Sequence, residues 1–79
     1  MSVKEEILMI MKDIKPTVNL DGIDDIIDAG YLDSLELMSL ITALMEKYEI
    51  EIGIDWITPE NFNSIDAIAN MVTKLKSNV

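Results

Sequence analysis

Neither cysteine nor histidine occurs among the 79 residues of the sequence, and this double absence limits what the chain can fold into. A chain of this length buries a small core, so it needs well-packed helices, disulfides or a bound metal to be stable. The missing residues exclude disulfides and zinc sites built on Cys or His. They also exclude Cys nucleophiles, Ser–His pairs and imidazole bases. We therefore expect one domain over residues 1–79, with no metal site and no enzymatic activity of its own.

The charge of the chain limits its partners. The formal net charge is −9 and no arginine is present, whereas binding to nucleic acid depends on clustered Lys and Arg. Anionic membrane surfaces are disfavoured for the same reason, so we expect neither nucleic-acid binding nor stable membrane association. The apolar stretch near the start is interrupted by charged residues, which predicts no signal peptide or spanning segment. The sequence therefore predicts a cytoplasmic protein whose acidic field attracts basic patches on partner proteins.

Apolar residues at helical spacing predict three main helices. The first covers residues 3–14 and stops before Pro16, which disfavours helical geometry in the residue ahead of it. The second covers residues 34–48 and the third covers residues 65–76. The residues expected to face the core are Val3, Ile7, Ile10, Met11 and Ile14 in the first helix, Leu37, Leu40, Ile41, Leu44 and Tyr48 in the second, and Ile65, Ile68, Ala69, Val72 and Leu75 in the third.

The stretch EIEIGIDWI, residues 49–57, alternates enough to suggest a β-strand. Nothing else in the chain pairs with it, and a lone strand is unstable. We therefore expect an extended connection that places Ile50, Ile52 and either Ile54 or Trp56 in the core.

A short helical turn is expected between this connection and the last helix. Thr58 is suited to cap it and Pro59 to occupy its first turn, and it ends near Phe62 because Asn63 and Ser64 cap the next helix at once. The sequence thus predicts an all-α fold: a small bundle of three main helices plus one short helix, with a long loop between the first and second helices.

That long loop, residues 16–33, carries two glycines and several aspartates, with apolar residues between them. A loop of this length in a compact domain usually serves a function. The aspartates Asp21, Asp24, Asp25 and Asp28 could suggest calcium binding, but an EF-hand places acidic ligands at alternate positions, then a glycine and a distant Glu. The spacing here does not fit, so no dedicated cation site is predicted. The residues expected to pin the loop are Val18, Leu20, Ile23, Ile26 and Ile27.

The second helix has the clearest start and two apolar faces. Asp33 is suited to cap it, and Glu36 stands where a capping box requires an acidic residue. Leu35, Met38 and Met45 form a second apolar line, offset from the core-facing residues. A small domain has little room to bury both faces, which favours the interpretation that the second face is an exposed surface for transient binding partners. The alternative is that Leu35 or Met45 simply packs in the core.

Ser34 is the residue most suited to carry chemistry. It lies in the first turn of this helix, where unpaired backbone N–H groups and a partial positive charge tolerate an attached phosphate. The nearby acids Asp28, Asp33 and Glu36 would repel a free phosphate, so a covalent phosphodiester is easier to explain than an anion-binding pocket. The simpler alternative is that Ser34 only begins the helix, since serine is common there.

The segment GYLDSLEL, residues 30–37, resembles the phosphopantetheine attachment signature of acyl and peptidyl carrier proteins. The likeness extends over nearly the whole chain, in the order of the helices and in the segment TPENFNSIDAI, residues 58–68. The resemblance implies that Ser34 carries a 4'-phosphopantetheine arm and that Asp33 belongs to the attachment motif.

The resemblance also implies a docking surface on the second helix. Its apolar residues would be Leu35 and Met38, and its acidic residues Glu36 and Glu46. Many carriers of fatty-acid synthesis have further acids in this helix, where this chain has Ser39 and Met45. The acidic recognition helix is therefore thinned, which argues against a role as the general fatty-acid carrier.

The function implied by the resemblance is to tether acyl or aminoacyl intermediates as thioesters on an arm donated by coenzyme A. The implied partners are a phosphopantetheinyl transferase, a loading ligase and downstream pathway enzymes, and a monomer is expected. A dedicated pathway, as for D-alanyl or peptidyl carriers, is favoured over primary fatty-acid synthesis. A different class also remains: a small acidic interaction module with Ser34 unmodified.

Overall fold

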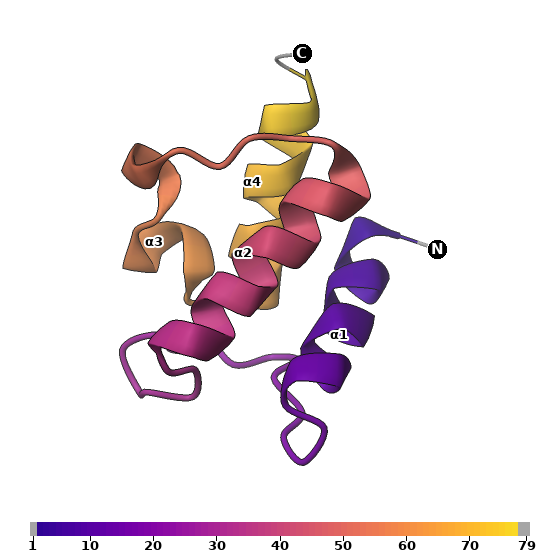
Figure 1. Cartoon of the computed structure of the whole chain (residues 1–79). Helices are drawn as coiled ribbons and strands as arrows, with labels where there is room; N and C mark the ends of the chain where they lie inside the picture. Colours follow the sequence, from indigo (N-terminus) through magenta and orange to yellow (C-terminus); the bar gives the residue numbers. More distant parts are fainter. Residues whose placement is uncertain (1, 78–79) are drawn as a thin grey trace.

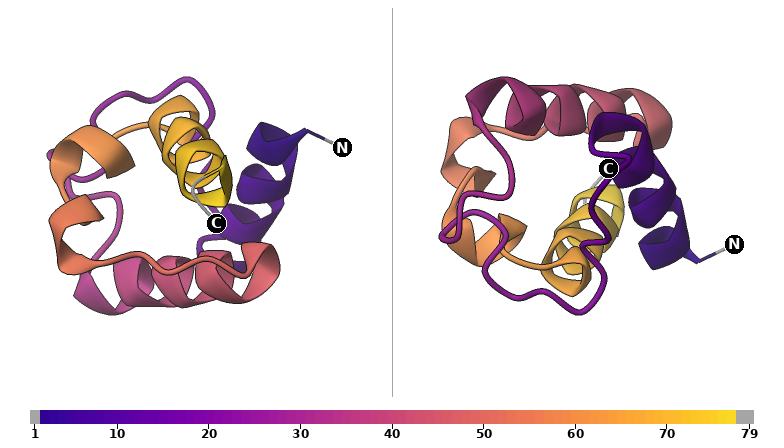
Figure 2. Two further views of the ribbon diagram at one scale, coloured as in Figure 1. Left: turned by 90° about the horizontal axis from the view of Figure 1, so that it is seen from above. Right: turned by 90° about the horizontal axis from the view of Figure 1, so that it is seen from below.

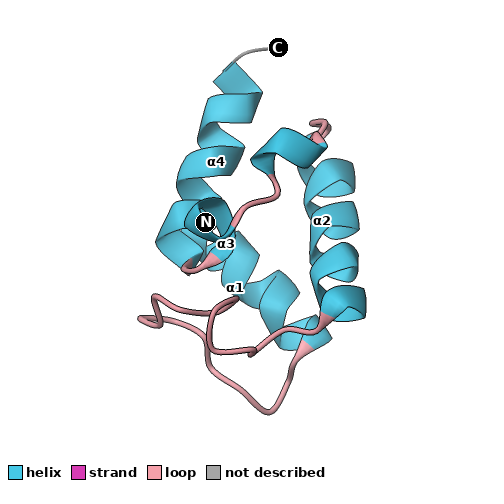
Figure 3. Cartoon of the chain, turned by 90° about the vertical axis from the view of Figure 1, so that its left-hand side faces the viewer, coloured by secondary structure: helices cyan, strands magenta, loops and turns pink. Residues whose placement is uncertain are grey.

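The computed structural model describes residues 2–77, which form four α-helices and one 3₁₀ turn (Figure 1). No strand is found in this part of the chain (Figure 3). The all-α prediction is therefore confirmed. In chain order the elements are α1 (Val3–Ile14), α2 (Ser34–Tyr48), η1 (Ile54–Trp56), α3 (Pro59–Phe62) and α4 (Ile65–Ser77).

Side-chain caps explain where the long helices begin. Ser2 accepts a hydrogen bond from the Glu5 N–H at the start of α1, and the Glu5 carboxylate accepts one in return, which completes a capping box. At the start of α4 the Ser64 hydroxyl accepts from the Ala67 N–H at 3.0 Å. Thr58 occupies the cap position of α3, but its side chain makes no capping hydrogen bond. The short α3 therefore relies on Pro59 in its first turn.

The core lies between α1, α2 and α4, and α3 packs against α4 (Figures 1 and 2). Eight of the fifteen residues predicted to face the core are buried, and the other seven are half-buried and pack against the core. Met71 is buried as well, although the sequence analysis did not place it in the core. The buried apolar side chains are Ile7, Met11, Leu20, Ile26, Leu32, Leu40, Ile41, Leu44, Ile50, Ile52, Phe62, Ile65, Ile68, Met71 and Val72.

The connection after α2 behaves as predicted, with one addition. Ile50 and Ile52 are buried, and Trp56 rather than Ile54 packs against the core, since Ile54 is 88% exposed. Residues 54–56 form a 3₁₀ turn that the sequence analysis did not anticipate. None of the described helices is long and apolar enough to cross a lipid bilayer.

The loop between α1 and α2 is pinned from both sides. Leu20, Ile26 and Leu32 are buried, while Val18, Ile23 and Ile27 are half-buried against the core. The other anchor is Asn63, at the end of α3. Its backbone carbonyl accepts from the Ile26 N–H at 2.9 Å, and its side-chain Oδ1 accepts from the Ile27 N–H at 2.9 Å. The loop is therefore fixed on its way to the start of α2.

A polar contact also joins the far end of α2 to α1. The Tyr48 hydroxyl donates to Glu6 Oε1 at 2.7 Å, and the Lys76 ammonium of α4 lies 5.2 Å from the centre of the Tyr48 ring. The hydrogen bond lowers the pKa of the Glu6 carboxyl. Burial, followed by this bond, raises the pKa of the Tyr48 hydroxyl.

Candidate functional site

The start of α2 is built around a reciprocal capping box. The Asp33 Oδ1 accepts from the Glu36 N–H at 2.8 Å, and the Glu36 Oε1 accepts from the Asp33 N–H at 2.9 Å. Asp33 itself is extended, with φ −85° and ψ 179°, so the first helical residue is Ser34. Both Asp33 and Ser34 are exposed. The local sequence therefore places a serine hydroxyl at a helix N-terminus and open to solvent.

Hydrogen bonding separates Ser34 from most of the other serines. The chain has five, at positions 2, 34, 39, 64 and 77. The side chains of Ser2, Ser64 and Ser77 form hydrogen bonds within or at the ends of their own helices. Within residues 2–77, the hydroxyls of Ser34 and Ser39 make no hydrogen bond that would have to break before a reaction. Only Ser34 of these two lies at a helix N-terminus, where backbone N–H groups and the helix dipole favour an attached phosphate.

A lysine at the end of α1 reaches this helix start. The Lys15 Nζ donates to the Tyr31 carbonyl at 2.8 Å and lies 3.3 Å from the Glu36 Oε1. The side chains of Lys15 and Glu36 are only 28% and 24% exposed. Glu36 is thus held between the capping box and Lys15 and is not a free acid on the surface. No local pattern in the sequence indicates this role of Lys15, because its partners lie 16 and 21 positions later in the chain.

The outer face of α2 forms an open groove of about 660 Å³. Leu35 and Met38, which line it, are 79% and 53% exposed and lie side by side on this face of the helix. Met45 does not join them, because it is half-buried against the core, as the alternative interpretation had it. The groove is lined by Leu35, Met38, Ser39, Thr42, Ala43 and Glu46. The structure therefore brings together three of the four residues predicted for docking, and leaves Glu36 outside the groove.

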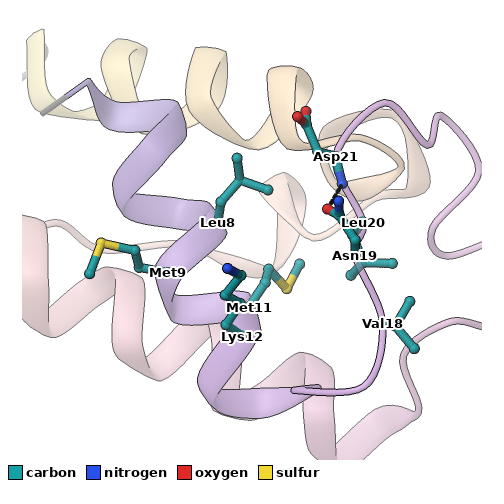
Figure 4. Close-up of a pocket in the computed structure, with 8 residues that line it drawn as sticks. All are labelled: Leu8, Met9, Met11, Lys12, Val18, Asn19, Leu20 and Asp21. Atoms are coloured by element: carbon teal, nitrogen blue, oxygen red, sulfur yellow. Dashed lines mark hydrogen bonds between the residues drawn. The ribbon is translucent and has the colours of Figure 1, made fainter.

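A smaller groove of about 230 Å³ separates α1 from the first part of the long loop (Figure 4). Met9 is its most exposed apolar residue, at 55%. The Asp21 N–H donates to Asn19 Oδ1 at 3.0 Å on the loop side. The residues lining the groove are Leu8, Met9, Met11, Lys12, Val18, Asn19, Leu20 and Asp21. No sequence signal had pointed to this surface.

Two aspartates of the loop, Asp21 and Asp28, take part in contacts within the protein. Asp21 lies 3.4 Å from the Lys4 ammonium, which also pairs with Asp66 of α4 at 3.2 Å. These contacts raise the pKa of Lys4, with the hydrogen bond to Asp66 as the largest cause. Asp28 accepts from the Asn63 Nδ2 at 3.1 Å. Among residues 2–77, no three Asp or Glu side chains are grouped so as to hold a metal ion.

Comparison with known proteins agrees with this geometry. The family model described as "Phosphopantetheine attachment site" matches residues 5–72. The chain is similar to the D-alanyl carrier proteins of Streptococcus gordonii and Streptococcus thermophilus, with 30% identity to each over 98% of this chain and 99% of the relative. It is 28% identical to the D-alanyl carrier protein of Streptococcus sanguinis over the same shares.

Proposed function

The chain belongs to the family of carrier proteins with a phosphopantetheine attachment site, and from this membership we propose that Ser34 is the residue that bears the arm. The observation that carries the proposal is the exposed Ser34 hydroxyl in the first turn of α2, directly after the capping residue Asp33. The match to the family model spans this position. The protein is a carrier, and the reactions of its cargo belong to partner enzymes.

The residues around Ser34 suit a covalently bound 4'-phosphopantetheine. A phosphodiester on Ser34 would lie at the N-terminal end of a helix, where the dipole favours negative charge. Lys15 offsets the charge of Glu36 next to it. When bound, the cofactor supplies a terminal thiol that holds the cargo as a thioester. The chain contributes an exposed attachment point, held by the capping box at the start of α2, and a surface that partners recognise.

We propose further that the cargo is an aminoacyl group of a dedicated pathway. The relatives are D-alanyl carriers, similar over nearly their full length. The groove on α2 presents a single acid, Glu46, because Glu36 is engaged and Ser39 stands where many fatty-acid carriers have an acid. Partner enzymes that bind a densely acidic helix through basic patches would bind this surface weakly.

The partners that follow are a phosphopantetheinyl transferase, an amino-acid ligase and the enzyme that consumes the aminoacyl thioester. Each must bind and release the same small surface, which calls for transient interfaces. The groove on α2, with Leu35 and Met38 at its exposed end, is the surface proposed for them. We expect the carrier to act as a monomer.

The test is to load the carrier after the arm has been attached. The protein is converted with coenzyme A and a promiscuous transferase, then offered to an adenylating amino-acid ligase or to a malonyl transferase of fatty-acid synthesis. We expect an aminoacyl thioester with the first and little loading by the second, with Ser34→Ala inactive in both. Efficient malonyl loading would contradict the aminoacyl proposal. A wild-type chain that never gains an arm would instead support the interaction-module alternative.

A further inference from the structure

The end of α1 and the start of α2 lie at the same end of the bundle (Figures 1 and 3). One side chain, Lys15, joins them. Its backbone N–H closes α1 by donating to the Met11 carbonyl at 2.7 Å, so the residue itself is fixed. Its Nζ then donates to the Tyr31 carbonyl and pairs with Glu36, 16 and 21 positions later in the chain.

One carboxylate oxygen of Glu36 makes both the contact with Lys15 and the capping hydrogen bond. The Glu36 Oε1 that lies 3.3 Å from the Lys15 Nζ is the same atom that accepts from the Asp33 N–H. Lys15 therefore holds the backbone on both sides of the buried Leu32: at Tyr31 directly, and at Asp33 through Glu36. The next residue is Ser34. We call Lys15, Glu36 and the two backbone groups they hold the α1–α2 clamp.

The burial of the clamp separates it from ordinary surface ion pairs. Both side chains are about three-quarters buried, whereas exposed pairs contribute little to stability. Hydrogen bonds with a charged partner are stronger than neutral ones, and two of them hold the backbone of the segment 31–36, at Tyr31 and at Asp33. By contrast, Lys12 is exposed, in the same helix, and forms no ion pair with the residues that the structure describes.

Two roles for Glu36 lead to opposite expectations for Lys15. If partner enzymes read Glu36 as a docking acid, Lys15 competes with them and its removal would help. If Glu36 acts within the clamp, removal of Lys15 loosens the segment that presents Ser34. The burial of Glu36 and its absence from the groove on α2 favour the second role.

We propose that Lys15 is a positioning residue for arm attachment, which acts through Glu36 and Tyr31 to hold Ser34 in the geometry that the transferase requires. The inference rests on the proposed function of Ser34. An attacking hydroxyl must be held in a narrow range of positions, and a small displacement by a distant change costs rate rather than binding. The effect is therefore expected in kcat for attachment more than in KM for the carrier.

The experiment measures attachment kinetics with coenzyme A and a promiscuous transferase on the full chain. The variants are Lys15→Met, Lys15→Arg, Glu36→Gln and the double variant Lys15→Met with Glu36→Gln, and Lys12→Met is the matched control. We expect Lys15→Met to lower kcat/KM about tenfold, the change that corresponds to loss of one charge-assisted hydrogen bond. Lys15→Arg should restore most of the rate, and Lys12→Met should leave it unchanged. The double variant should be no worse than the poorer single variant, because Lys15→Met already removes the contact that Glu36→Gln only weakens.

A second readout reports on the clamp without the transferase. Amide exchange at Asp33 should accelerate in Lys15→Met and not in Lys12→Met, with circular dichroism showing that both are folded. A wild-type rate in folded Lys15→Met together with a loss in Glu36→Gln would overturn the inference and make Glu36 a docking acid. Should Lys15→Met fail to fold, Lys15→Gln, which loses the ammonium but keeps a polar side chain, takes its place, and a wild-type rate in that folded variant would overturn the inference equally. If the wild-type chain itself gains no arm, the proposed function of Ser34 fails. If wild type and Lys15→Met are modified at the same rate, only the inference about Lys15 fails.

Discussion

The half-buried Asn63 links the long loop to the rest of the bundle, and we expect its replacement by alanine to lower the stability of the fold markedly. Its Oδ1 accepts from the Ile27 N–H at 2.9 Å and the Asp28 N–H at 3.2 Å, and its Nδ2 donates to Asp28 Oδ2 at 3.1 Å. Asn63→Ala removes all three hydrogen bonds. It leaves the backbone bond from the Ile26 N–H to the Asn63 carbonyl in place.

The size of the effect follows from the burial of the partners. The Ile27 N–H is partly buried and would lose its partner at close to the full cost, whereas the two groups of Asp28 are exposed and water can replace Asn63 there. Together the losses amount to about 2 kcal/mol in the free energy of unfolding. For a chain of this size, that corresponds to a decrease in Tm of about 10 °C. Backbone strain does not contribute, because Asn63 has φ −76° and ψ −14°, which alanine adopts readily.

Urea and thermal unfolding, followed by circular dichroism, measure this directly. Asn70→Ala is the matched control: Asn70 is exposed on α4, and its side chain forms no hydrogen bond within residues 2–77. The free energy of unfolding of this control should lie within about 0.5 kcal/mol of the wild-type value. An Asn63→Ala variant as stable as the control would refute the reasoning, because the loop would then be held by its apolar residues alone.

Two further predictions concern the far end of α2 and its outer face. Tyr48→Phe should lower Tm at pH 7, because it removes the hydrogen bond to the Glu6 carboxylate. The lowered pKa of Glu6 means that this bond is stronger while the carboxylate is charged, so the difference in Tm from wild type should narrow as the pH falls below 4.5. A difference that is unchanged at pH 3 would contradict this. Leu35→Ala should change the free energy of unfolding by less than about 0.5 kcal/mol, because Leu35 is exposed, but it should slow loading by partner enzymes. Leu40→Ala, at a fully buried position, should lower the free energy of unfolding by about 3 kcal/mol. Equal losses of stability in the two variants would contradict the assignment of the two faces.

Helix boundaries were predictable because their signals are local. The caps Asp33 and Ser64 lie within three residues of the groups they bind, and Pro16 limits α1 from two positions away. The predicted ranges of α1 and α2 match the structure, and α4 extends one residue further, to Ser77. The exposure of Leu35 and Met38 followed from helical periodicity in the same way.

Contacts between distant segments could not be predicted. Nothing near Asn63 in the sequence indicates that it binds amides more than 30 positions earlier, and Lys15 gives no sign of its pairing with Glu36. Glu36 illustrates the consequence: its place in a capping box is visible in the sequence, but its burial by Lys15 is not. We therefore propose that docking depends on Leu35 and Met38, which are exposed on the groove of α2, more than on Glu36, which lies outside it.

The claim that Ser34 bears the arm is tested most directly by locating the modification among the five serines. The chain is incubated with coenzyme A and a transferase of demonstrated activity, then digested, and the fragments are sequenced by mass spectrometry. We predict one phosphopantetheinyl group on the fragment that contains Ser34, retained in Ser39→Ala and lost in Ser34→Ala. A group on another serine, or an unmodified chain beside a fully modified reference carrier, would contradict the account.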